Sequence, residues 1–201
     1  MRKSCFTADP PFFSDNGKFK VQLIPYHNTR FLQDINYFID MRYDNNMKLK
    51  IGQKAPDFIL PDQAGKKHSL KDYKGREVLL YFYPKDDTPG CTTEACTIRD
   101  SYSGFQKSKI VVLGVSVDSI KSHEKFASKY KLLFTLLSDE DKKVVKAYGV
   151  WGKKKFMGRE YMGTNRTSFL IDPQGKISKI YEQVKPALHA GEVLDGVQKK
   201  K

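Results

Sequence analysis

The sequence contains few of the residues from which many kinds of site are built. It has three cysteines, four histidines and one tryptophan among 201 residues. Three cysteines are an odd number without even spacing, which excludes a disulfide framework and favours a reducing compartment such as the cytoplasm. No apolar run approaches the roughly 20 residues that a transmembrane helix requires, so we expect a soluble protein without a membrane contact.

Acidic residues are also scarce relative to basic ones. The formal net charge is +13, and residues 48–201 alone carry 30 basic and 18 acidic residues. The densest internal cluster is Lys153-Lys154-Lys155, and Lys199-Lys200-Lys201 ends the sequence. No RNP-like motif or zinc-finger spacing accompanies these lysines, so the pattern favours a solvated basic face over a nucleic-acid surface. Such a surplus can still steer anionic partners.

Residues 1–46 do not follow the pattern of the rest of the chain. They are rich in aromatic residues without a clean period, and their five aspartates argue against an organelle transit peptide. Three interpretations stay open: an ordered extension on the domain, a weak targeting segment, or an upstream start before Met47. We therefore predict an N-terminal extension of unknown role, 1–46, and one domain, 47–201. Cys5 lies in this extension and is interpreted as incidental.

The most informative segment is residues 84–96, which carries the other two cysteines. The preceding run of β-forming residues, 78–83, predicts a buried strand, and Pro84 ends it. The composition of residues 92–105 predicts a helix, so we expect Cys91 in its first turn. There the unpaired backbone N–H groups and the positive end of the helix dipole favour a thiolate over a thiol.

The spacing of these two cysteines limits how they react with each other. On one continuous helix, residues five apart have Cα atoms about 8.6 Å apart. A disulfide requires Cα atoms within about 7 Å. If Cys91 and Cys96 share a helix, they cannot bond until its first turn unwinds. We therefore interpret the pair as a dithiol that cycles and not as a permanent crosslink.

Four interpretations of this pair require different neighbours. A structural disulfide would close too short a loop to stabilise the fold much. A zinc site requires four ligands, and the nearest histidines, His68 and His123, are distant in sequence. A thioredoxin-like exchanger would use Cys-x-x-Cys, whereas four residues separate these sulfurs. The fourth is a nucleophilic cysteine with a partner that traps its sulfenic acid. No metal or cofactor is expected, and no adjacent histidine supplies the base of a cysteine protease.

Residues 84–91, Pro-x-x-x-Thr-x-x-Cys, resemble the active-site motif of the peroxiredoxins. Cys96 lies where the bacterioferritin comigratory protein (peroxiredoxin Q) branch keeps its resolving cysteine. Further segments resemble landmarks of that branch in the same order: Lys54-Ala55-Pro56-Asp57-Phe58, Leu136-Leu137-Ser138-Asp139, Tyr148-Gly149-Val150-Trp151-Gly152 and Arg166-Thr167-Ser168-Phe169-Leu170-Ile171-Asp172. The likeness runs from about residue 47 to residue 198.

The resemblance implies roles for six residues. Cys91 would be the peroxidatic thiolate that becomes a sulfenic acid, and Cys96 would resolve it as an intramolecular disulfide. Thr88 would accept a hydrogen bond near the thiolate or the substrate, and Pro84 would shield the sulfur from solvent. Arg166 would hold the thiolate and polarise the O–O bond. Glu94 resembles the position that orients this arginine.

When the resemblance is set aside, two of these residues also fit roles without chemistry, and Arg166 has a rival. Thr88 is a common type of helix-capping residue. A glutamate such as Glu94 is favoured in any first helical turn. Arg99 follows Cys91 by two turns, and without the resemblance nothing selects Arg166 over it.

The order of elements supports an α/β, thioredoxin-like fold, with a central mixed sheet and helices on both faces. We expect strands at 78–83, 110–117, 134–137, 168–171 and 177–183. We expect helices at 92–105, from about residue 120 to residue 130, at 142–148 and at 189–198. Asp172-Pro173-Gln174-Gly175 predicts a hairpin turn between the last two strands.

The resemblance implies that the protein is a thiol-dependent peroxidase, and we expect it to be a monomer or a weak dimer. It would reduce hydrogen peroxide or alkyl hydroperoxides and take electrons from thioredoxin or a similar dithiol protein. One alternative is a peroxide-sensing redox switch or holdase with slow turnover, which multiple-turnover assays would separate. A second is a basic nucleic-acid-binding protein with incidental thiols, whose affinity would depend steeply on salt.

Overall fold

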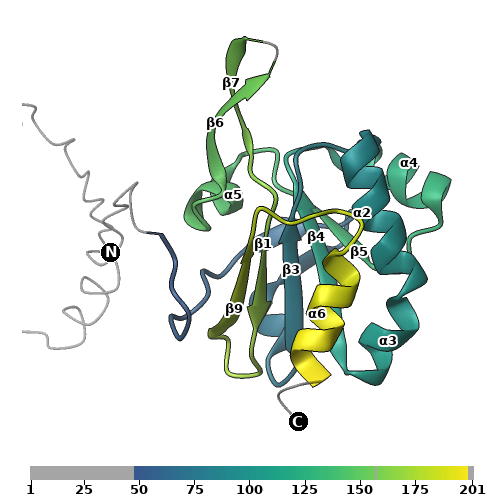
Figure 1. Cartoon of the computed structure of the whole chain (residues 1–201), viewed down its shortest axis with the longest axis vertical. Helices are drawn as coiled ribbons and strands as arrows, with labels where there is room; N and C mark the ends of the chain where they lie inside the picture. The colour runs from purple at the N-terminus through teal and green to yellow at the C-terminus, as the bar shows by residue number, and fades with distance from the viewer. Residues whose placement is uncertain (1–47, 157, 199–201) are drawn as a thin grey trace, which may run out of the picture. The chain divides into compact units, whose positions relative to one another are not determined.

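The structure, a computed structural model, describes residues 48–156 and 158–198. Its centre is a five-stranded sheet with the strand order β5-β4-β3-β8-β9 (Figure 1). The parallel strands are β3 (Glu77–Phe82), β4 (Ile110–Ser116) and β5 (Thr135–Ser138). The antiparallel edge consists of β8 (Thr167–Ile171) and β9 (Ile177–Glu182). The predicted mixed sheet is therefore confirmed.

Strand β3 lies at the middle of the sheet and is buried on both faces. Side chains of a strand alternate between the two faces, so a central strand covered on both sides is apolar throughout. One face of β3 contributes Leu79 and Tyr81 to one core cluster, and the other contributes Val78, Leu80 and Phe82 to a second. This burial explains the continuous apolar run seen in the sequence.

Helices cover both faces of the sheet, as predicted. The first core cluster includes buried residues of α2 (Pro89–Asp100), α3 (Tyr102–Lys107), α4 (Ile120–Tyr130) and α6 (His189–Gln198). Of these, α2, α3 and α6 lie close together in Figure 1. The second cluster includes residues of α5 (Lys143–Ala147) and of β1 (Ile59–Pro61). The short strand β2 (Lys67–Ser69) pairs with β1, and the 3-10 helix η1 (Leu70–Tyr73) follows it.

The prediction of one helix over residues 92–105 is wrong at Ser101. Helix α2 ends at Asp100 and α3 begins at Tyr102, because Ser101 leaves the helical region with φ −93° and ψ 6°. Ser103 and Gly104 follow, and both residue types have low helix propensity. By contrast, the predicted turn at residues 172–175 is confirmed. The Gly175 N–H donates to the Asp172 carbonyl at 2.9 Å, and Gly175 has φ +81°.

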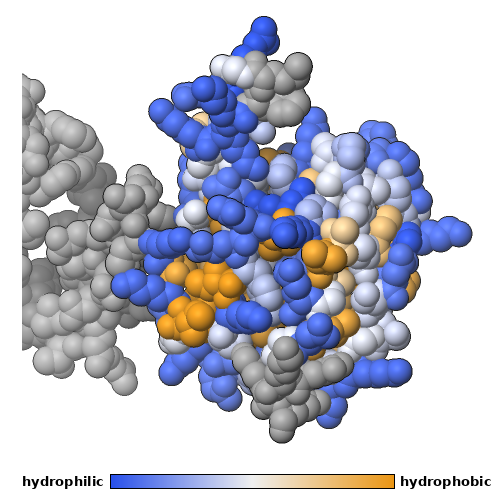
Figure 2. Space-filling model, in the orientation of Figure 1, coloured by the Kyte–Doolittle hydropathy of each residue, from blue (hydrophilic) through white to orange (hydrophobic). Residues whose placement is uncertain are grey.

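A hairpin of β6 (Trp151–Phe156) and β7 (Arg159–Thr164) was not predicted. In Figure 1 it stands out from the body of the domain, and most of its surface is hydrophilic in Figure 2. Lys153 and Lys155 are exposed on β6, so part of the lysine cluster does form a solvated face. Apart from Trp151, which packs against the second core cluster, β6 is rich in lysine and lacks the apolar alternation by which strands are identified.

Three predictions concern residues outside the described ranges. These are the extension 1–46 with Cys5, the boundary at Met47, and the lysines 199–201, and they stay predictions. No helix of the described residues is long and apolar enough to cross a membrane.

Candidate active site

Cys91 lies in the first turn of α2, as the sequence predicted. Thr88 is the N-cap residue and Pro89 opens the helix, where its fixed φ suits the helix and its missing N–H is not needed. The Thr92 N–H donates to the Thr88 carbonyl at 2.8 Å and closes the first turn. The N–H groups before it have no carbonyl partner within the helix, so their partial positive charge favours a thiolate at Cys91. The Cys91 side chain is buried and not in a disulfide.

Arg166, not Arg99, is the guanidinium that the structure brings to Cys91. Arg166 lies in the connection between β7 and β8, and its Nη2 is 3.3 Å from Sγ of Cys91. Arg99 instead donates to the Tyr130 carbonyl at 2.6 Å and pairs with Asp100 at 2.8 Å. The two residues 75 apart in sequence meet because β8 follows Arg166 directly and pairs with β3, whose end leads to α2.

Arg166 is held from its other side by Glu94, which lies one turn after Cys91. The Arg166 Nη1 donates to Oε2 of Glu94. Burial opposes the charge of Arg166, but Glu94 and Cys91 offset this, and the pKa of Arg166 is raised. The guanidinium is therefore a fixed positive charge beside the sulfur.

Glu94 is fully buried, and its second oxygen, Oε1, has no hydrogen-bond partner among the described residues. Burial without a full set of hydrogen bonds disfavours the carboxylate. It raises the pKa of Glu94 to about 7, although Arg166 acts in the opposite direction. The Glu94 carboxyl group therefore changes its charge near neutral pH.

Thr88 and Pro84 lie in the loop between β3 and α2. The Thr88 hydroxyl makes no capping hydrogen bond, although Thr88 is the N-cap residue, and it donates to the Lys85 carbonyl at 2.9 Å. Because its proton is used there, the oxygen is left to accept a hydrogen bond. Pro84 is half-buried and follows the buried Tyr83. Thr88 precedes Cys91 by three positions, and neither residue makes a hydrogen bond to Cys91.

Cys96 lies further along the same helix and is partly buried and free. Helix α2 is continuous from Pro89 to Asp100, so it contains both cysteines. In the folded protein the two Cα atoms are therefore about 8.6 Å apart, the spacing of an ideal helix. A Cys91–Cys96 bond requires the first turn to unwind.

Three residues near the site were not predicted from the sequence to be site residues. Gly90 leaves room for the guanidinium, because a Cβ there would lie 3.3 Å from Nη2 of Arg166. Lys154, on β6, is partly buried; burial lowers its pKa, Arg166 lowers it further and Cys91 opposes the shift. Burial and Arg166 lower the pKa of His189 to about 4, so this ring is neutral. A glycine, a lysine in a charged run and an isolated histidine carry no signal in a single sequence.

The arrangement suits a nucleophilic thiolate that reacts without a separate base. Arg166 and the helix N-terminus both stabilise negative charge on the sulfur and on an oxygen that reacts with it. Within the described ranges, no group of three or more His, Cys, Asp or Glu side chains is arranged to hold a metal ion.

Residues 51–180 match the model of the AhpC/TSA family. The chain is 49% identical to peroxiredoxin Bcp of Bacillus subtilis over 148 residues, which are 74% of this chain and 94% of that protein. It is also 49% identical to peroxiredoxin Bcp of Escherichia coli over 147 residues, 73% of this chain and 94% of that protein. The structure resembles the bacterioferritin comigratory protein of Xanthomonas campestris, which was studied for its alkyl peroxide reduction activity. That match has a TM-score of 0.70 and 34% identity, and it covers 75% of this chain and 99% of that one.

Proposed function

This chain belongs to the AhpC/TSA family and to its peroxiredoxin Bcp branch, whose members are thiol peroxidases, and from that premise we propose that it reduces alkyl hydroperoxides and hydrogen peroxide through a Cys91–Cys96 disulfide cycle. The observation that carries the proposal is the contact between Arg166 Nη2 and Cys91 Sγ, 3.3 Å long, at the N-terminus of α2. A buried sulfur with a fixed cation and helix N–H groups around it is a nucleophile for the O–O bond.

In the first step, the Cys91 thiolate attacks the terminal oxygen of the hydroperoxide. The S–O bond forms as the O–O bond breaks, and the sulfur is oxidised to a sulfenic acid. An alkoxide leaves and takes up a proton to become an alcohol, or water when the substrate is hydrogen peroxide. Arg166 stabilises the charge that moves from sulfur to oxygen, and Thr88 accepts a hydrogen bond from the substrate. Glu94 orients Arg166, and Pro84 limits access of water.

In the second step, the first turn of α2 unwinds and the Cys96 sulfur attacks the Cys91 sulfenic acid. A disulfide forms, and the sulfenic oxygen leaves as water. An external dithiol then reduces this disulfide by thiol–disulfide exchange and is itself oxidised. We propose thioredoxin or a similar dithiol protein as this reductant. A reducing compartment such as the cytoplasm, and a monomer or weak dimer, fit the same cycle.

Trapping the oxidised sulfurs tests the cycle. Reduced wild type, Cys91→Ser and Cys96→Ser are each treated with one equivalent of hydrogen peroxide or of an alkyl hydroperoxide, and intact mass and peptide mapping locate the oxidised sulfur. We expect a Cys91–Cys96 disulfide in the wild type, a sulfenic acid at Cys91 in Cys96→Ser, and no rapid reaction in Cys91→Ser. Multiple turnover with thioredoxin and its reductase then tests the reductant.

Other products would overturn specific parts of the proposal. Survival of both thiols in the wild type would exclude the peroxidase reaction at this site. A disulfide through a cysteine other than Cys96 would leave Cys91 as the nucleophile but exclude Cys96 as its partner.

A further inference from the structure

The loop between β3 and α2, residues 83–88, is attached to helix α4 by two consecutive aspartates. Asp86 is buried and contacts the first half of α4, and Asp87 is exposed and contacts its end. The same loop carries Pro84 and Thr88 and leads directly into the turn that holds Cys91. The attachment is therefore placed to control that turn, although neither aspartate hydrogen-bonds to the sulfur.

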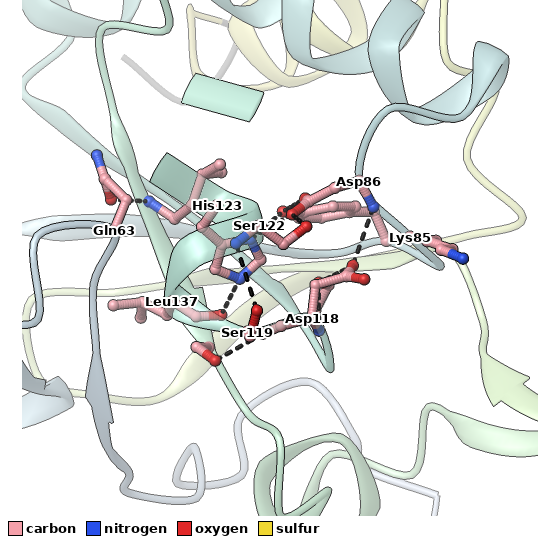
Figure 3. Close-up of polar contacts among 12 residues, drawn as sticks. Gln63, Lys85, Asp86, Asp118, Ser119, Ser122, His123 and Leu137 are labelled. Carbon is pink, nitrogen blue, oxygen red and sulfur yellow. Dashed lines mark hydrogen bonds and ion pairs between the residues drawn. The ribbon is translucent and has the colours of Figure 1, made fainter. Parts of the chain in front are cut away.

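Both oxygens of the Asp86 carboxylate have partners (Figure 3). Oδ1 accepts a hydrogen bond from the Tyr83 hydroxyl at 2.7 Å. Oδ2 accepts one from the Ser122 hydroxyl at 2.7 Å and lies 2.8 Å from Nδ1 of His123. The Asp86 backbone N–H donates to Oδ2 of Asp118 at 2.9 Å. Backbone and side chain of Asp86 are thus both tied to the segment that leads from β4 into α4.

His123 connects Asp86 to the central sheet. Its Nδ1 faces the Asp86 carboxylate, and its Nε2 lies 3.2 Å from the carbonyl oxygen of Leu137, on β5. A carbonyl oxygen only accepts, so Nε2 donates to Leu137 while Nδ1 shares a hydrogen bond with the Asp86 carboxyl group. The side chains of His123 and Asp86 are 0% and 4% exposed. The Asp86–His123 contact is therefore a hydrogen-bonded pair shielded from water.

The two aspartates differ in how strongly they resist movement of the loop. Separating the Asp86–His123 pair would leave buried polar groups without their hydrogen-bond partners, which is strongly unfavourable. Asp87 pairs with Lys129 at 2.7 Å and accepts a hydrogen bond from the Tyr130 hydroxyl at 2.5 Å, but the Asp87 and Lys129 side chains are 47% and 57% exposed, so water replaces these contacts more readily. Movement of residues 83–88 is therefore opposed mainly at Asp86.

We propose that the Asp86–His123 pair positions the loop so that it sets how readily the first turn of α2 unwinds. The pair would thereby divide the Cys91 sulfenic acid between two fates, and this inference rests on the disulfide cycle proposed above. In one fate Cys96 attacks, and water leaves. In the other, the sulfenic acid attacks a second hydroperoxide, takes one oxygen to become a sulfinic acid, and releases an alcohol or water. An intact pair favours the folded turn, which speeds the first oxidation and delays Cys96.

Asp86→Asn and Asp87→Asn form a matched pair of variants that tests this role. Asp86→Asn keeps the size of the side chain but cannot accept hydrogen bonds from all three donors. Asp87→Asn makes the same change at the next residue, and asparagine tolerates the left-handed backbone there, φ +54°. Each reduced protein is mixed with one equivalent of hydrogen peroxide and quenched at intervals. Intact mass gives the rates of Cys91 oxidation and of disulfide formation, and excess peroxide gives the sulfinic fraction.

We expect Asp86→Asn to slow Cys91 oxidation and to speed disulfide formation, each about tenfold, and to lower the sulfinic fraction. Asp87→Asn should change either rate by less than about twofold. Opposite changes in the two steps distinguish positioning from general loss of stability, which would not speed the second step. If both rates fall together, or if the two variants behave alike, the Asp86–His123 pair has no such role and the disulfide cycle stands. If the wild type forms no Cys91–Cys96 disulfide, the disulfide cycle is wrong, and the proposed role of the Asp86–His123 pair is then wrong too.

Ser122→Ala provides a second test in case Asp86→Asn does not fold. It removes one hydrogen bond to Asp86 and leaves the Asp86–His123 pair in place. We expect the same opposite changes, each about threefold. Two rates equal to those of the wild type would refute the role of this contact.

Discussion

At the scale of single residues, Glu94 links protonation to the stability of the fold. The pKa of Glu94 is about 7 in the folded protein, against the value of 4.5 expected for an unfolded chain, because burial disfavours its charge. Between these pH values the folded protein binds more protons than the unfolded one, so its free energy of unfolding falls as the pH rises. Between pH 4.5 and pH 7, the free energy of unfolding of the wild type should fall, relative to that of Glu94→Gln, by on the order of 1 kcal/mol per pH unit.

Urea denaturation of the two reduced proteins between pH 4.5 and pH 8 measures this difference. The other ionisable groups are common to both proteins, so their contributions cancel in the comparison to first order. A raised pKa at Glu94 would be contradicted if the wild type did not lose stability relative to Glu94→Gln as the pH rises, or if it gained stability.

Gly90 tests whether the position of Arg166 sets the rate. A Cβ at Gly90 would lie 3.3 Å from Nη2 of Arg166, closer than most such contacts, so Gly90→Ala displaces the guanidinium or the first turn of α2. We expect the rate constant of Cys91 oxidation to fall about tenfold, because the cation then no longer meets the reacting atoms. Rapid mixing of reduced protein with hydrogen peroxide measures it.

Gly191→Ala is the control for this substitution. Gly191 also lies in a helix, α6, but a Cβ there would meet no atom within 4 Å. The rate constant should stay at the wild-type value, while the free energy of unfolding rises by about 0.5–1 kcal/mol from the better helix propensity of alanine. Equal rate losses in the two variants would mean that the crowding of Arg166 is not the cause.

At the scale of elements, α2 is the part of the fold that must change during the proposed cycle. Its continuous helix holds Cys91 and Cys96 too far apart to bond, so the disulfide form must lack the first turn. We expect the amide hydrogens of residues 91–96 to exchange at least about tenfold faster in the oxidised protein than in the reduced one. Hydrogen–deuterium exchange with mass spectrometry measures this, and the amides of α4 serve as the internal reference. Unchanged protection of α2 in a fully formed disulfide would contradict the unwinding.

The elements differ in how far they could be predicted from the sequence. The strand at β3, Cys91 and the start of α2 lie within one continuous motif, where apolar patterning and helix-terminus chemistry act over short range. Arg166 is 75 residues from Cys91 and was assigned only through a family resemblance. The Asp86–His123 contact spans 37 residues and joins two polar side chains that local patterns place on the surface. Such contacts arise from how strands pair, which no local spacing encodes.

At the scale of the whole molecule, the +13 charge affects encounters with a charged reductant. The exposed Lys153 and Lys155 lie on the β6–β7 hairpin, which leads directly into Arg166. Their field acts over the screening length of the solution, which is about 30 Å at 0.01 M salt and about 8 Å at 0.15 M. An acidic thioredoxin should therefore be attracted at low salt, and its kcat/KM should fall as salt rises.

Two double variants separate attraction by the hairpin from attraction by the net charge. Lys153→Gln with Lys155→Gln, and Lys66→Gln with Lys67→Gln, remove the same charge from exposed positions. We expect the hairpin pair to lower kcat/KM for the acidic reductant several-fold more at low salt, because the hairpin leads directly into Arg166, which contacts Cys91. Oxidation of Cys91 by hydrogen peroxide, an uncharged substrate, should depend little on salt in all three proteins. Equal losses in the two variants would assign the steering to the net charge, whereas a kcat/KM independent of salt would exclude electrostatic steering altogether.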